Sequence, residues 1–159
     1  MNWKKIVLSG CILFLCYHAP LMAQPSAEAC AAIQKLIDKA EGKLVLDGIM
    51  GEDKIGTQKF TATEIRKKLI TADKNKIAIE RIYYNINWRG GFQHYIWPAG
   101  NGSSKYAKLR ALVFKFKNDV TYKLDEDDDS PSQTSEIVLY FLAKDEAEME
   151  ALLKQYIRN

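Results

Sequence analysis

One histidine and one cysteine are the side chains best suited to catalysis, because the others of these types lie in an N-terminal segment that we expect to be removed. A nucleophile usually needs a base beside it, and Cys30 with His94 is the pair that remains. Cys30 falls on the apolar side of a predicted helix, where burial makes a thiol unreactive. One histidine and one cysteine also fall short of the three or four ligands of a zinc site. We therefore expect a structural Cys30, with an intermolecular disulfide as the alternative, and no catalytic residue, metal or cofactor.

An acidic segment near the C-terminus has part of the spacing of a calcium-binding loop. Its carboxylates occupy the first, third, fifth and twelfth positions of such a loop, and they are Asp125, Asp127, Asp129 and Glu136. Ser130 stands where the loop needs a glycine for its sharp turn, and Pro131 follows it. We expect a solvated acidic loop here and keep calcium binding as the alternative.

Nucleotide and nucleic-acid functions find little support in the sequence. Gly51 and Gly56 have the separation of a phosphate-binding loop, but Thr57 and Gln58 stand where that loop requires lysine and then serine or threonine. Basic and aromatic residues alternate over 83–122, as they do in some proteins that bind single strands. The expected export and the near balance of charge argue against such a partner, so we expect no nucleic acid.

The most promising binding surface is a predicted hairpin around Gly90-Gly91, a pair that suits a two-residue turn. The turn would fix the register, so that Trp88 opposes Gln93 and the strands divide into two faces. The polar face is the expected partner-binding surface: Asn85, Asn87, Arg89, Phe92 and His94. The other face gathers large aromatic residues, which are the expected lining if the domain holds a ligand: Tyr84, Trp88, Tyr95 and Trp97.

Three helices are expected to support this sheet. Ser26 is placed to cap a helix over 26–41 whose apolar residues follow three-four spacing. Thr61 and Glu64 have the spacing of a capping box and predict a short helix over 61–73. A last helix opens at Asp145 and carries an apolar stripe.

The rest of the chain is expected to supply strands. A short strand over 43–46 leads into a glycine-containing loop over 47–57, and a half-buried strand begins at Ile77. A second hairpin is predicted with the loop 117–119, and the strand 136–142, apolar on both faces, is expected to be central. The pattern predicts an α+β fold: a mainly antiparallel sheet of about five strands, with an N-terminal helix, a short helix and a C-terminal helix packed on it.

The first residues have the features of an export signal. Lys4 and Lys5 precede an apolar run of about a dozen residues, too short to span a bilayer, and small Ala23 marks a cleavage site. We expect a signal peptide over 1–23, a single domain over 24–159 and a location in a bacterial periplasm or outside the cell. Lipidation at Cys11 is the alternative, and we expect no transmembrane segment.

Charge then becomes nearly balanced, because the 23 basic residues fall to 21 without Lys4 and Lys5, against 20 acidic ones. With no cofactor loop, metal cluster or base and nucleophile pair, surface recognition is the resource that remains. We therefore expect an exported, non-catalytic binding module that recognises a protein or an envelope component, as an inhibitor or immunity-like protein would. The alternatives are a carrier of a small apolar ligand and, after it, a small hydrolase-type enzyme that uses His94 as general acid or base.

Overall fold

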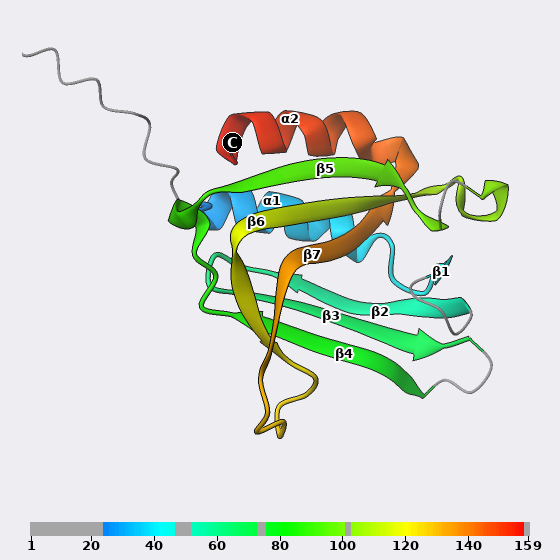
Figure 1. The fold of residues 1–159 in the computed structure, drawn as a ribbon. Helices are drawn as coiled ribbons and strands as arrows, with labels where there is room; N and C mark the ends of the chain where they lie inside the picture. The colour runs from blue at the N-terminus through cyan, green and yellow to red at the C-terminus, as the bar shows by residue number, and fades with distance from the viewer. Residues whose placement is uncertain (1–23, 47–51, 73–75, 101–102, 158–159) are drawn as a thin grey trace, which may run out of the picture.

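The computed structural model describes residues 24–46, 52–72, 76–100 and 103–157, so the predicted signal peptide and Cys11 lie outside the described residues. Seven strands form one sheet in the order β1-β2-β3-β4-β6-β5, with β7 paired to β6, and all pairings are antiparallel. Two α-helices of the described ranges pack on it (Figure 1). The predicted α+β class and antiparallel sheet are confirmed, whereas the expected count of about five strands is wrong. The elements are α1 (Ala27–Asp38), β1 (Leu44–Leu46), β2 (Glu52–Phe60), β3 (Glu64–Thr71), β4 (Ile77–Tyr84), β5 (Phe92–Pro98), β6 (Leu109–Lys123), β7 (Ser132–Leu142) and α2 (Glu146–Tyr156).

The sheet curls because its longest strands bend. β4 pairs with the last residues of β6 and β5 pairs with its first half, so both lie on the same edge of β6. The register between β6 and β7 shifts between Lys115 and Val120, next to the break between β4 and β5. Figure 1 shows β6 and β7 turning there, so that β5 with half of each long strand lies above the β2–β3–β4 wall.

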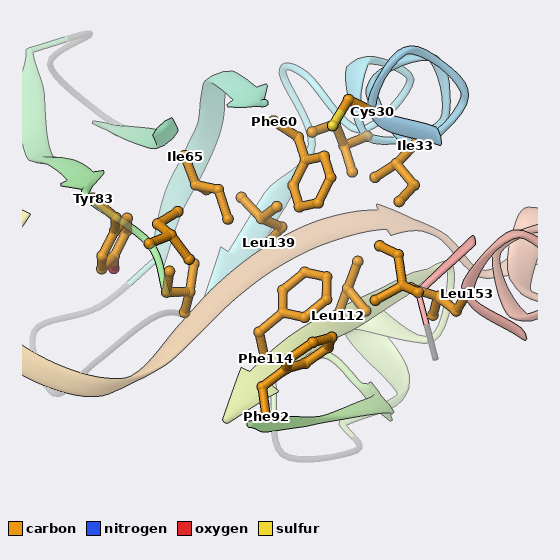
Figure 2. Close-up of a cluster of buried hydrophobic side chains, with 14 of the residues drawn as sticks. Cys30, Ile33, Phe60, Ile65, Tyr83, Phe92, Leu112, Phe114, Leu139 and Leu153 are labelled. Carbon is orange, nitrogen blue, oxygen red and sulfur yellow. The ribbon is translucent and has the colours of Figure 1, made fainter. Parts of the chain in front are cut away.

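Both terminal helices form as their sequences predict. The side-chain oxygen of Ser26 accepts a hydrogen bond from the Ala29 N–H at 3.1 Å and caps α1. Ile33 and Leu36 of α1, and Met149 and Leu153 of α2, are buried against the upper part of the sheet. Figure 2 shows Cys30 and Ile33 of α1 in this core with Leu112, Leu139 and Leu153. The apolar stripes read from the sequence therefore bury the faces expected.

Aromatic rings fill the core where the sheet bends. The Trp88 ring lies 5.1 Å from that of Phe92 and 5.4 Å from those of Phe114 and Phe116, in edge-on arrangements, and Phe60 completes the group. Trp88 is 1% exposed, and its Nε1 donates to the Ala62 carbonyl at 2.7 Å. These contacts hold the β4–β5 connection against the core.

The short helix predicted over 61–73 is replaced by strand β3, and part of the predicted loop 47–57 is strand β2. The Thr61 hydroxyl accepts from the Glu64 N–H at 2.9 Å and donates to the Glu64 carbonyl at 2.8 Å. The spacing read as a capping box therefore closes the tight turn between β2 and β3. The alternation of β3 is not visible in the sequence, because a lysine, Lys67, occupies one of its buried positions (2% exposed). Its Nζ lies 5.5 Å from the centroid of the Tyr140 ring.

Both predicted hairpins are wrong. Residues 88–90 form a 3₁₀ turn in which the Asn87 side chain accepts from the Gly90 N–H at 3.0 Å, and Gly91 leaves it with φ of 93°. β5 then pairs with β6 instead of returning along β4. The segment 117–119 does not turn back either, because β6 runs on through it as one strand.

β7 is buried on both faces, as predicted. It is not a central strand, because among the described strands it pairs with β6 alone. Its other edge faces the Gln58 side chain of β2. The Gln58 amide accepts from the Tyr140 N–H at 2.7 Å and donates to the Tyr140 carbonyl at 2.9 Å and the Ile37 carbonyl at 3.3 Å. One buried side chain thus closes the seam between β2 and β7.

Candidate functional site

The five residues of the predicted partner face do not share one surface. Asn85, Asn87 and Arg89 are exposed in the connection between β4 and β5, and Asn85 adopts a left-handed φ of 55°. Phe92 is only 5% exposed and belongs to the aromatic core. His94 is half-buried on β5. The predicted face depended on the Gly90-Gly91 hairpin, and it is lost with that register.

His94 faces helix α2 across a shallow pocket of about 240 Å³, which Ile96, Glu150, Leu153 and Lys154 also line. A general base needs a proton to abstract within hydrogen-bond reach and a partner that orients it. The carboxylate that shares this pocket, Glu150, is already in an ion pair with Lys154 at 3.4 Å. Lys154 therefore competes with His94 for the Glu150 carboxylate.

The four aromatic residues considered for a ligand cavity separate into different environments. Trp88 lies within one buried cluster, Tyr95 borders a second cluster, Tyr84 is half-buried, and Trp97 is 58% exposed. Tyr95 and Trp97 stay together, with ring centroids 5.8 Å apart. The set therefore does not surround a common cavity, and Tyr95 with Trp97 instead forms an aromatic pair on β5.

Cys30 lies in the hydrophobic core, and aspartates of the acidic segment bond backbone N–H groups of the same segment. Burial raises the pKa of the Cys30 thiol, and within the described part of the chain this cysteine has no disulfide partner. In the acidic segment, Asp128 accepts from the backbone N–H groups of Leu124 and Ser130, and these bonds lower its pKa. Glu136 lies on β7 beside Lys115, 3.6 Å away. Among the described residues no group of three or more acidic, histidine or cysteine side chains is arranged to hold a metal ion.

The feature that stands out in this region is the outer edge of β5. In an antiparallel pair, residues alternate between those that bond to the partner strand and those that point away. The Lys117 N–H bonds to the Gly91 carbonyl at 2.9 Å, and the Ala99 N–H bonds to the Leu109 carbonyl at 3.4 Å. Counting by twos from Gly91 to Ala99 gives the residues that bond β6, which include Gln93, Tyr95 and Trp97. The backbone groups of the residues between them, Phe92, His94 and Ile96, therefore point away from β6.

β5 ends the strand order, and no other strand of the described ranges pairs with its outer edge. Edge strands are usually shortened, charged or covered, because an open edge can pair with another chain. β1 is only three residues long, and the unpaired part of β4 carries Glu80 and Arg81. Residues 92–97 contain no Lys, Arg, Asp or Glu and present Tyr95 and Trp97 beside the edge, and Pro98 ends the strand. Sequence reasoning missed this edge because it paired β5 with β4, although the uncharged run was readable.

Comparisons with known proteins assign no relationship: no protein-family model, no curated protein and no solved structure matches the chain. Within the residues that the structure describes, no helix is both long enough and apolar enough to cross a membrane.

Proposed function

We propose that this protein is an exported, non-catalytic binding domain that recognises a protein partner by accepting an extended segment of it as an additional strand on β5. The observation that carries the proposal is the open, uncharged edge of β5 with Trp97 exposed beside it. In this mode of recognition, backbone hydrogen bonds supply affinity and the alternate side chains of the peptide supply specificity.

The two faces of β5 define what the added segment would meet. On one face lie Tyr95 and Trp97, which offer apolar and aromatic contact. On the other face, His94 and Ile96 lie next to Glu150 and Lys154 of α2. Tryptophan and tyrosine are enriched where interfaces concentrate their binding energy. The expected partner segment is therefore extended and uncharged at its centre, with apolar side chains placed against Tyr95 and Trp97.

Selection of random linear peptides on the immobilised protein tests the proposal, with affinities of selected peptides then measured on variants. Ile96→Pro removes an N–H that points away from β6, and its ring obstructs an added strand, so we expect at least about tenfold weaker binding. Ile96→Val keeps the N–H and is the matched control. Trp97→Ala should weaken binding about thirtyfold.

Two results would contradict this function. One is peptides that bind Ile96→Pro as tightly as the unaltered protein, which would show that β5 is not the site. The other is a dimer in light scattering that Ile96→Pro dissociates, because the occupant of the edge would then be a second copy of this chain. Leu124→Ala, at another exposed apolar residue (53% exposed), should leave peptide binding unchanged.

A further inference from the structure

A second site lies at the end of the molecule where β6 begins and β7 ends. These segments meet the connection between α1 and β1 (Figure 1) and enclose a pocket of about 490 Å³. Leu109 pairs with Leu142 across the two strands, and the Ala143 N–H donates to the Lys108 carbonyl at 2.8 Å. The pocket is lined by Lys43, Ala107, Lys108, Leu109, Leu142, Ala143 and Lys144. Its volume is in the range of small-molecule sites.

The apolar part of the lining comes from strand ends. Leu109 is 3% exposed and is part of a buried cluster that Leu142 borders. Ala107 and Ala143 are too small to fill the space in front of these leucines. The pocket thus has a firm apolar floor supported by the core, and an occupant with an apolar body would cover it.

The charged residues that line the pocket are all lysines. Three nearby acids each have an ion-pair partner: Asp145 with Lys39 at 3.1 Å through Oδ1, Glu146 with Arg110 at 2.7 Å, and Glu52 with Lys105 at 2.6 Å. The Oδ2 atom of Asp145 is buried without a hydrogen bond to any described residue. Tyr106 also donates to Glu52, at 2.5 Å.

Lys43, Lys108 and Lys144 are exposed around the pocket, and none of them has an ion pair with another described residue. Three positive charges therefore surround an apolar floor.

We propose that this pocket binds a small amphiphile with an anionic head group, of the class of medium-chain carboxylates. A purely apolar ligand would leave the three lysines without function, and a simple inorganic anion would leave the leucine floor uncovered. A carboxylate at the entrance with an aliphatic chain over Leu109 and Leu142 satisfies both parts. This site shares no residue with the β5 edge, so the two proposals stand or fall separately.

Calorimetry with hexanoate, octanoate and decanoate, each below its micelle concentration, tests the proposal on the purified protein. Affinity should rise about fourfold for each methylene added, the value expected for burying a methylene. Octan-1-ol, which has the octanoate chain without the charge, should bind about tenfold more weakly, and high salt should weaken octanoate binding.

Variants locate the binding. Replacing Lys43, Lys108 and Lys144 together by glutamine should weaken octanoate binding about tenfold. The same replacement at the exposed Lys35, Lys76 and Lys117 changes net charge equally and should have little effect. Ala107→Trp fills the pocket and should abolish binding, with the midpoint of thermal unfolding nearly unchanged because Ala107 is exposed.

Any of three outcomes overturns the proposal. The first is the absence of saturable octanoate binding, and the second is equal affinity for octanoate and octan-1-ol. The third is an equal loss of binding in the two triple-lysine variants, which would mean general attraction by net charge. Vesicles of phosphatidylglycerol separate a membrane-held lipid from a free amphiphile: binding to vesicles without binding to octanoate also counts against the pocket.

Discussion

Two strand edges of the same sheet differ in what bonds the backbone groups that point away from the neighbouring strand. At the seam between β2 and β7, the Gln58 amide takes the place of a neighbouring strand and bonds both backbone groups of Tyr140. At β5, no strand among the described residues occupies the corresponding position, and the strand contains no Lys, Arg, Asp or Glu. Buried backbone groups must be paired, whereas exposed ones can bond water. The first edge therefore belongs to the core, and the second is the edge at which we propose that a partner strand binds. The difference separates a structural edge from a candidate binding edge.

Replacing Gln58 tests the closed edge most severely. Gln58→Ala removes the side-chain bonds to the buried N–H and carbonyl of Tyr140 and to the Ile37 carbonyl. Each buried polar group that loses a hydrogen-bond partner costs about 1 to 3 kcal/mol. We expect the free energy of unfolding in urea to fall by about 3 to 5 kcal/mol. Gln93→Ala, the same substitution on exposed β5, should change it by less than about 0.5 kcal/mol. Equal losses in the two variants would remove the distinction between the edges.

Gln34 gives a smaller effect at the same seam. Its side chain accepts from the Phe60 N–H at 2.6 Å and donates to the Gln58 carbonyl at 2.8 Å, so it joins α1 to the end of β2. These bonds are partly solvated, and water can replace them in a variant. Gln34→Ala should therefore lower the free energy of unfolding by about 1 to 2 kcal/mol. A loss as large as that of Gln58→Ala would show that both amides are equally essential to the seam.

Proline substitutions on β5 test which backbone groups face outward. Ile96→Pro removes an N–H that does not bond β6, so the free energy of unfolding should fall by about 1 kcal/mol or less. Tyr95→Pro removes an N–H that the register directs to Val113, and the loss should be several times larger. Thermal unfolding followed by circular dichroism measures both. If the two losses are reversed, the alternation assigned to β5 is wrong by one residue.

Sequence patterns predicted the elements whose burial follows a simple period. We could predict the apolar stripes of α1 and α2 and the two apolar faces of β7, because the spacing of apolar residues along the sequence shows them directly. β3 was misread because Lys67 occupies an inward position where the pattern expects an apolar residue. The pairing of β5 was missed because Gly90 and Gly91 suit a hairpin equally well, and the bend that forbids one depends on contacts with β6.

The sites were harder to predict, for the same reason. Gln58 and Tyr140 are far apart in the sequence and meet only after the sheet curls. The three lysines of the second pocket come from three separate connections, so no spacing relates them. The open edge of β5 is a property of strand order, which local patterns do not contain.

Cys30 provides the smallest effect, and it reports on the closed side of the molecule, where α1 covers the end of β2. Burial raises the pKa of its thiol above the ordinary value, so the folded protein keeps the proton at pH values where the unfolded chain, with a thiol pKa of about 8.5, releases it. Fewer protons on the unfolded state mean that the free energy of unfolding decreases as pH rises from that unfolded pKa toward the folded one. Below it the contribution is constant.

The stability difference between the unaltered protein and Cys30→Ala should therefore be constant from pH 6 to about pH 8 and should move in favour of the variant by about pH 9.5. Urea unfolding at several pH values measures this difference, and the subtraction cancels the titration of lysines and tyrosines that both proteins share. Parallel curves up to pH 9.5 would mean that the thiol titrates alike in both states. In that case water would reach the Cys30 thiol in the folded protein, and α1 would pack less tightly over the end of β2 than the structure shows.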